Sequence, residues 1–296
     1  MWLGWRKNGG ADAMKIQSLI QRISETTFLG GKKEQTIGPP VLTEAMRFPY
    51  GPFRFKTQLP KGAPYTIQAS TDLLHWNLIS EDTASAEALE YVDSDASKHS
   101  YRFYRVQAGE VLSTNVIGYV SVTLAPGFSM IANPLDGPSN NVADMFKEWP
   151  DGATLHKFDT RFFRLAENAI KNGKWTNSTE TLSPGEGAIF FNPTSDYKSH
   201  SFVGEIMQGN LSMPIPSGFS LRSSIVPQPG SIEDLEFPIA DGDVIHLFDR
   251  DRQKYVLHPY EGGKWTAGPP IVSAGESFWV AKTEPGNWTR HFSIAG

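Results

Sequence analysis

Apolar and polar residues alternate along short segments over most of the chain. In Phe53–Thr57, Tyr65–Ala69 and Tyr101–Val106, successive side chains switch between apolar or aromatic residues and polar or basic ones. A period of two residues is typical of strands that bury one face. Clusters of Gly, Pro, Ser and Asp separate these segments, as turns between strands require. The pattern predicts an all-β fold built from many short strands.

A helical pattern occurs near the N-terminus. Ile16, Leu19, Ile20 and Ile23 are spaced i, i+3, i+4 and i+7, which places them on one face of a helix. Glycines and prolines follow, so residues 1–45 are predicted to form a short helix and a linker. The apolar stripe must be covered, either by the chain's own β domain or by a second subunit. In the second case the helix would join the protein to itself or to other subunits of a surface assembly.

Residues 46–113 contain five strand-like segments separated by turns, which is typical of a small β-sandwich. The stretch Ile67–Leu73, followed by Trp76, Tyr91-Val92-Asp93 and Arg102–Arg105, resembles a fibronectin-III-like module. Modules of this kind recur in predicted secreted proteins of verrucomicrobial and planctomycete bacteria. The resemblance implies a sandwich fold and carries no biochemical activity.

Residues 114–296 contain an internal repeat of about ninety residues, which indicates a duplicated structural unit. The two copies match at an offset of 91 positions at first and of 90 positions later, so one residue is lost between Pro134 and Asp151. We therefore predict two β units, residues 114–207 and 208–296, with the same strand order. The matches include Gly127-Phe128-Ser129 with Gly218-Phe219-Ser220, His156 with His246, Phe158-Asp159 with Phe248-Asp249, and Gly173–Thr176 with Gly263–Thr266.

Each copy contains a Gly-aromatic turn, an aromatic-Asp hairpin and a Trp strand, and the first copy adds Pro184-Gly185-Glu186-Gly187 before an apolar strand. This pattern resembles a second module, which occurs in tandem in predicted secreted or surface proteins of the same bacteria. The second copy departs from it at Ala274-Gly275-Glu276-Ser277. The resemblance implies a barrel or a sandwich, located outside the cell or on its surface, and it implies no chemistry.

Composition narrows the classes of function. The net charge is −5 and no Lys/Arg-rich run is present, so the electrostatic signature of a nucleic-acid partner is missing. The chain has no cysteine, which excludes disulfides and thiolate metal sites. No apolar run reaches the ~18 residues that span a membrane. No apolar segment typical of a signal peptide follows Met1 or the alternative start Met14, so the sequence leaves export open.

Two pairs of equivalent residues invite a chemical role. His156 and His246 are candidate metal ligands, but neither has the neighbouring ligands at the spacing of a metal site, which favours half-buried strand positions. Glu186 and Glu276 are candidate general acid and base of a glycosidase. Both glutamates lie in predicted turns, and duplication alone explains their recurrence. The structural interpretation is therefore favoured for both pairs.

Aspartates form a third group of candidates. Asp159 and Asp249 each follow a phenylalanine, where an Asp side chain accepts backbone hydrogen bonds in a turn. The alternative is a Ca²⁺ site, helped by Asp251 in the second copy, or by Asp93 and Asp95 in the N-terminal module. Neither place supplies the ~6 oxygen ligands that Ca²⁺ needs. We predict no catalytic residue, no metal and no cofactor.

Trp175 and Trp265 are the candidate ligand-binding residues. Aromatic rings exposed on β domains bind the apolar faces of sugars, and the preceding Lys174 and Lys264 could donate hydrogen bonds to hydroxyls. The alternative is that both tryptophans belong to the cores of their units. That alternative is favoured because Trp is highly buried on average.

The sequence favours a non-catalytic structural or adhesive protein of a bacterial cell surface or extracellular assembly. The first alternative is a carbohydrate-binding protein that binds polysaccharide through exposed aromatic rings. A third is an enzyme whose catalytic carboxylates come together only in the folded chain.

Overall fold

The computed structural model describes residues 38–48 and 51–294. This part of the chain is built almost entirely from β-strands, so the predicted all-β fold class is confirmed. Its helical elements are the 3-10 helix η1 (Ser94–Lys98) and the four-residue helix α2 (Val142–Met145). The predicted helix at Ile16–Ile23 lies outside the described residues.

The N-terminal module contains a three-stranded sheet and part of a larger one. The smaller sheet has the order β1-β2-β5. Strand β1 begins inside the range predicted as linker, because it pairs with β2 from Leu42 onward. The side chain of Asn115 bonds to both the backbone N–H and the C=O of Leu42. The strands of the module are β1 (Leu42–Arg47), β2 (Phe53–Gln58), β3 (Pro64–Ser70), β4 (Asn77–Thr83), β5 (Ala88–Asp93), β6 (Tyr101–Ala108) and β7 (Val111–Leu112).

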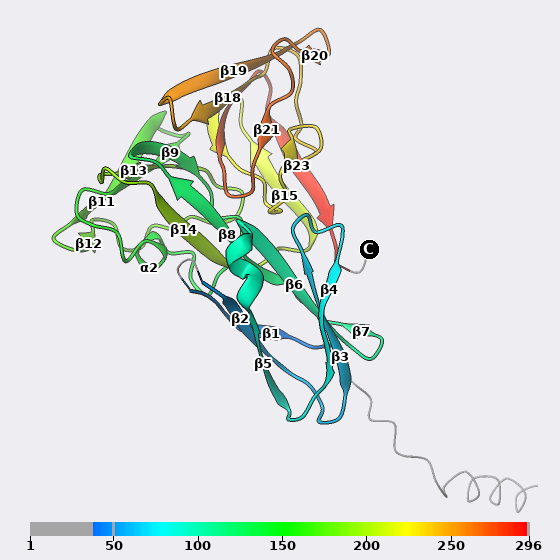
Figure 1. Cartoon of the computed structure of the whole chain (residues 1–296). Helices are drawn as coiled ribbons and strands as arrows, with labels where there is room; N and C mark the ends of the chain where they lie inside the picture. Colours follow the sequence, from blue (N-terminus) through cyan, green and yellow to red (C-terminus); the bar gives the residue numbers. More distant parts are fainter. Residues whose placement is uncertain (1–37, 49–50, 295–296) are drawn as a thin grey trace, which may run out of the picture. The chain divides into compact units, whose positions relative to one another are not determined.

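The larger sheet continues from the N-terminal module into the first copy. Its order is β14-β8-β6-β3-β4, with β7 paired to β6 (Figure 1). Strands β8 (Ile117–Leu124) and β14 (Lys198–Glu205) come from the first copy. Tyr101 pairs with Val120 where the two parts join. The predicted boundary at residue 113 therefore falls within one hydrogen-bonded sheet.

The two copies contain five-stranded sheets with the same strand order. The first has the order β12-β11-β10-β13-β9 and the second β20-β19-β18-β22-β16, and the pairing registers coincide at offsets of 90 and 91 residues. The strands of the first are β9 (Gly127–Ile131), β10 (Thr154–Asp159), β11 (Arg164–Lys171), β12 (Lys174–Trp175) and β13 (Ala188–Asn192). Those of the second are β16 (Gly218–Arg222), β18 (Val244–Asp249), β19 (Lys254–Glu261), β20 (Lys264–Trp265) and β22 (Phe278–Lys282).

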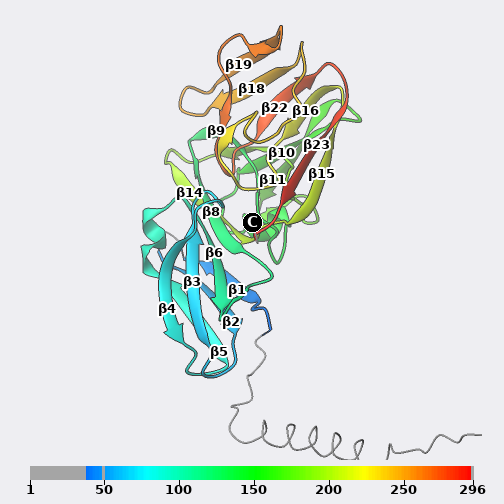
Figure 2. The ribbon, with the colours of Figure 1, turned by 90° about the vertical axis from the view of Figure 1, so that its right-hand side faces the viewer.

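The remaining strands differ between the copies. In the second copy, β15 (Gly209–Ile215) and β23 (Gly286–Phe292) form a separate two-stranded sheet, whereas their equivalents β8 and β14 extend the N-terminal module (Figure 2). The second copy also adds the short pair β17 (Gly230–Ser231) and β21 (Ile271–Val272). Between β9 and β10, the first copy has the helix α2. Between β16 and β18, the second copy instead has a turn, in which the Ser231 hydroxyl accepts a hydrogen bond from the backbone N–H of Asp234.

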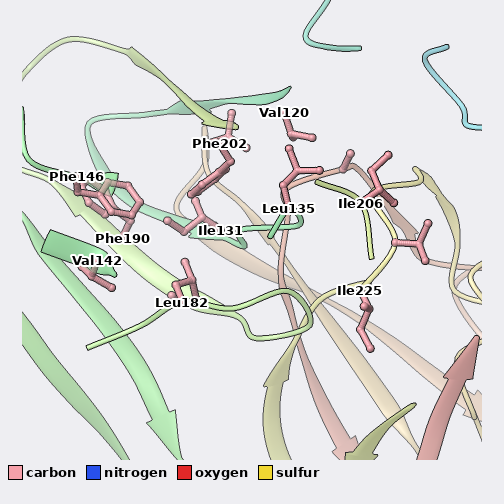
Figure 3. Close-up of a cluster of buried hydrophobic side chains, with 14 of the residues drawn as sticks. Val120, Ile131, Leu135, Val142, Phe146, Leu182, Phe190, Phe202, Ile206 and Ile225 are labelled. Atoms are coloured by element: carbon pink, nitrogen blue, oxygen red, sulfur yellow. The ribbon is translucent and has the colours of Figure 1, made fainter. Parts of the chain in front are cut away.

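The largest core cluster joins the N-terminal module to both copies. It contains Phe103 from the module, Phe146 and Phe190 from the first copy, and Ile225 and Phe292 from the second. Figure 3 shows Phe146, Phe190, Phe202 and Ile225 within it. A second core, around Ile245, Phe278 and Trp288, fills the second copy alone. The burial of these large side chains is the main stabilising term of the fold.

Candidate functional site

The two five-stranded sheets contact one another through equivalent residues. Met130, Ile189 and Leu221 form a small buried cluster, against which Phe158, Phe248 and Trp279 pack. Met130 is the equivalent of Leu221, Ile189 of Trp279, and Phe158 of Phe248. Each copy thus supplies the same three positions, as in the isologous interface of a symmetric dimer.

An open pocket of about 310 Å³ lies at one side of this contact. The first copy contributes Phe158 and Phe163, and the second contributes the other residues. Three of the lining rings are substantially exposed, at 66% for Phe163, 43% for Tyr255 and 39% for Phe219. The full lining is Phe158, Phe163, Phe219, His246, Tyr255 and Trp279. Five aromatic rings and one imidazole therefore surround a space that solvent can enter.

Strand pairing places the residues of the second copy on one face of its sheet. His246 lies opposite Trp279 on one neighbouring strand and opposite Leu257 on the other. Directly paired residues share a face, and alternate residues along a strand return to it. Phe219 and Tyr255 reach the same face from β16 and β19. The pocket is therefore fixed by strand register.

The hairpin between β10 and β11 brings Phe163 to the pocket. Asp159 accepts hydrogen bonds from the backbone N–H groups of Arg161 and Phe162, which closes the turn. Phe163 has a φ of 50°, in the left-handed region. Its ring packs edge-on against Phe158, with 5.3 Å between the centroids. The turn thus holds an exposed ring beside the second copy.

The rings of the pocket meet at steep angles. Phe158 and Trp279 lie 4.8 Å apart at 77°, and Phe163 and Phe219 lie 6.3 Å apart at 70°. Phe219 and His246 lie 5.7 Å apart at 67°. Edge-to-face packing is the favourable geometry for aromatic pairs.

Two polar groups accompany the rings. The Trp279 indole N–H donates to the Tyr255 hydroxyl at 3.3 Å, and that hydroxyl keeps its own proton to donate. Burial lowers the pKa of His246 below its ordinary value, so its imidazole is neutral at pH 7. No Asp, Glu, Lys or Arg belongs to the described lining. The pocket is apolar and uncharged, with two polar groups at its surface.

The sequence-predicted ligand residues lie elsewhere. Trp175 is buried in the large core beside Phe146, and Trp265 is half-buried in the core of the second copy, where its indole N–H donates to Glu233. Lys174 and Lys264 are exposed beside them on β12 and β20. Both tryptophans lie on the sheet face opposite to the one that carries the pocket. The structure does not bring these four residues together.

His156 and His246 occupy half-buried strand positions. His156 is half-buried, and its Nε2 lies 2.8 Å from the Thr154 hydroxyl. His246 belongs to the pocket wall. Across residues 38–48 and 51–294, no three His, Asp or Glu side chains are placed to hold a metal ion.

The candidate carboxylates act within turns. Asp249 accepts bonds from the backbone N–H groups of Asp251 and Arg252, as the turn interpretation predicted. Asp93 accepts from the Tyr104 hydroxyl and from Arg102.

The glutamates of the two equivalent turns have similar structural roles. Glu186 accepts from the Ser183 N–H and from Lys157, and Glu276 accepts from the Ser273 N–H. These contacts stabilise the turns before β13 and β22.

Sequence reasoning missed most of the pocket. The signal lay in positions where the copies differ: Tyr255 stands where the first copy has Leu165, and Trp279 where it has Ile189. An aromatic residue that appears in only one of two duplicated units is not required by the shared fold. Such positions point to a role specific to that copy.

Comparison with known proteins finds no protein-family model that matches the chain and no curated protein with significant similarity to it. Among the described helices, none has the length and apolar character needed to cross a membrane.

Proposed function

We propose that the protein is a non-catalytic adhesive protein that binds neutral carbohydrate in the aromatic pocket between its two tandem sheets. The observation that carries this proposal is the set of exposed rings, Phe163, Phe219 and Tyr255, around an uncharged opening. Large aromatic side chains in contact with solvent leave apolar surface uncovered, and such surface marks binding sites.

The chemistry of the lining favours a saccharide ring as the ligand. One face of a pyranose presents C–H groups, which suit aromatic rings, and its edge presents hydroxyls. The Tyr255 hydroxyl and the neutral His246 imidazole supply a donor and an acceptor for those hydroxyls. The absence of charge in the described lining favours a neutral sugar over an acidic one, since no cation is present to pair with a carboxylate or sulfate.

The adhesive role and the location outside the cell form the broader part of the proposal. They rest on the resemblance of the three β units to modules of secreted and surface proteins. A chain of β units that carries a sugar-binding pocket would attach a surface assembly to polysaccharide. Self-association through the predicted N-terminal helix belongs to the same proposal.

Affinity electrophoresis tests the binding function. The protein is run in native gels that contain a neutral polysaccharide (hydroxyethylcellulose, xylan, laminarin or mannan) or the acidic polysaccharide alginate. We expect retardation by at least one neutral polymer. The double variant Phe163→Ala/Tyr255→Ala should bind about tenfold more weakly or worse, equivalent to ~1.4 kcal/mol.

Phe162→Ala is the matched control, because Phe162 is 59% exposed and adjacent to Phe163 but does not line the pocket. The control should migrate like the unchanged protein. Equal retardation of the double variant and the control, or no retardation by any neutral polymer, would refute the proposed function.

A further inference from the structure

The contact between the two sheets has two sides, and the open pocket occupies only one of them. Phe163 of the first copy reaches Phe219 of the second. On the other side, Gln253 of the second copy reaches Phe128 of the first. Gln253 is the equivalent of Phe163, and Phe128 is the equivalent of Phe219. The two sides are therefore related by the same pseudo-twofold symmetry as the buried cluster between the sheets.

We infer that this second side is a latent version of the ligand pocket, and that the exposed side chains at two pairs of equivalent positions, 163/253 and 165/255, decide which side binds an apolar ring. The inference rests on the proposed function for the class of ligand, a neutral saccharide. The second side keeps Phe128, His156 and Phe248 in the places of Phe219, His246 and Phe158. It has Gln253, Leu165 and Ile189 where the open pocket has Phe163, Tyr255 and Trp279.

The retained residues preserve the geometry of the site. Phe128 and His156 lie 6.2 Å apart at 61°, close to the 5.7 Å and 67° of Phe219 and His246. Gln253 has a φ of 51° and Phe163 a φ of 50°, so the two hairpin turns present their side chains from the same backbone conformation. The backbone frame of the second side is thus that of the open pocket.

The replaced residues remove what a ring ligand would contact. The Gln253 amide accepts from the backbone N–H of Phe128 at 2.9 Å and donates to its C=O at 2.8 Å. This side chain is bound to the neighbouring copy, whereas Phe163 exposes an aromatic ring. Leu165 offers neither the ring nor the hydroxyl of Tyr255. Ile189 is 7% exposed and contributes no ring surface.

The consequence is one binding site per chain, on the side of Phe163. Exchange of the exposed residues should therefore remove binding from the open side in one variant and add binding to the latent side in the other. Phe163→Gln/Tyr255→Leu gives the open side the two exposed residues of the latent side and keeps Trp279. Gln253→Phe/Leu165→Tyr gives the latent side the two exposed residues of the open side and keeps the buried Ile189. All four positions are exposed, so the exchanges leave the buried contact intact.

The experiment measures stoichiometry with two probes. The first is Nile red, an uncharged fluorescent reporter of apolar pockets, titrated against each variant. The second is calorimetric titration with the neutral hexasaccharides of cellulose, xylan, laminarin and mannan. We expect one site in the unchanged protein, two in Gln253→Phe/Leu165→Tyr, and at least tenfold weaker binding in Phe163→Gln/Tyr255→Leu. Circular dichroism and melting curves establish that each variant is folded.

The outcomes separate this inference from the proposed function. Dye stoichiometry of one, two and none in the three proteins supports the latent pocket, even when no hexasaccharide binds. If the dye binds as expected but no hexasaccharide binds, only the proposed carbohydrate function is refuted. Unchanged dye binding in Phe163→Gln/Tyr255→Leu overturns the inference. A single site in folded Gln253→Phe/Leu165→Tyr overturns it independently.

Discussion

The two copies share one sheet design but place it in different surroundings. In the first copy, β8 and β14 pair with the N-terminal module, and Trp175 is 8% exposed in the large shared core. In the second copy, β15 and β23 pair only with each other among the described strands, and the equivalent Trp265 is half-buried. Strand order and register follow the duplicated pattern, whereas burial depends on which neighbours each copy has. Equivalent positions therefore contribute differently to stability.

One pair of equivalent buried positions carries charged side chains in the second copy and uncharged side chains in the first. The second copy buries Asp243 against Lys282, which also donates to the C=O of Pro238 at 2.6 Å. The first copy has Ala153 and Asn192 at the equivalent positions, both buried. Asn192 bonds to the C=O groups of Leu124 and Asp196. One sheet design thus accepts either an ion pair or an uncharged pair at this place.

The largest effect is expected at the first Trp strand. Trp175→Ala should lower the free energy of unfolding by about 4 kcal/mol, because a large side chain leaves a cavity in a packed core. Trp265→Ala should cost about 2 kcal/mol, since that ring is already in part exposed. Urea unfolding of both variants measures the difference. Equal losses would show that surroundings do not distinguish the two copies.

The buried ion pair should give the next largest effect. Asp243→Ala should cost about 3 kcal/mol, because it leaves the Lys282 ammonium buried without its counter-charge. The double variant Asp243→Ala/Lys282→Asn, which installs the residues of the first copy, should recover at least half of that loss. Urea unfolding of the three proteins checks this. No recovery would mean that the copies are not interchangeable here.

The same pair predicts a difference in acid stability. Burial raises the pKa of Asp243, but hydrogen bonds from Lys282, Thr283 and the Ala240 N–H outweigh it and hold the pKa below the ordinary value of ~3.9. A lowered carboxyl pKa stabilises the folded state above ~3.9, and this contribution is lost as the pH falls through the folded pKa. Melting temperatures from pH 7 to pH 3 should therefore fall more steeply for the unchanged protein than for Asp243→Ala/Lys282→Asn. Parallel curves would contradict the prediction.

The smallest effects on stability are expected at the two hairpin turns whose side chains, Phe163 and Gln253, contact the other copy. Gln253→Ala should cost about 1 kcal/mol, because it removes two hydrogen bonds to the backbone of Phe128. Phe163→Ala should change stability by less than about 0.5 kcal/mol, as is usual for an exposed side chain. Thermal unfolding distinguishes the two. A larger loss for Phe163→Ala would indicate a structural ring rather than a binding one.

Local patterns predicted much of the fold. The alternation in Phe53–Thr57, Tyr65–Ala69 and Tyr101–Val106 corresponds to β2, β3 and β6, because the side-chain period of a strand is visible in a few residues. The role of Leu42 was missed, since its hydrogen bonds come from Asn115, far along the chain. The joining of β8 to β6 was missed for the same reason: strand partners are not encoded in the strand alone.

The pocket was harder to predict than the sheets. Phe163 and Tyr255 are about ninety residues apart and meet only because the two copies face each other. Trp175 and Trp265 recur at equivalent positions because each packs in a core, so their recurrence does not indicate a ligand site. Function specific to one copy shows instead in differences, such as Ile189 against Trp279. A duplicated sequence is therefore best searched for aromatic residues that break its repeat.

The strands of the sheet shared by the N-terminal module and the first copy are synthesised far apart in time, because they are far apart in the sequence. Strand β6 is complete at Ala108, but its partner β8 ends at Leu124, and β14, the edge strand on that side, ends at Glu205. While the chain emerges from the ribosome, the edge of β8 waits for β14 from Leu124 to Glu205, over about eighty further residues. Open edges are the usual route to mispairing and aggregation. We therefore expect the N-terminal module and the first copy to complete their shared sheet only after β14 has been made.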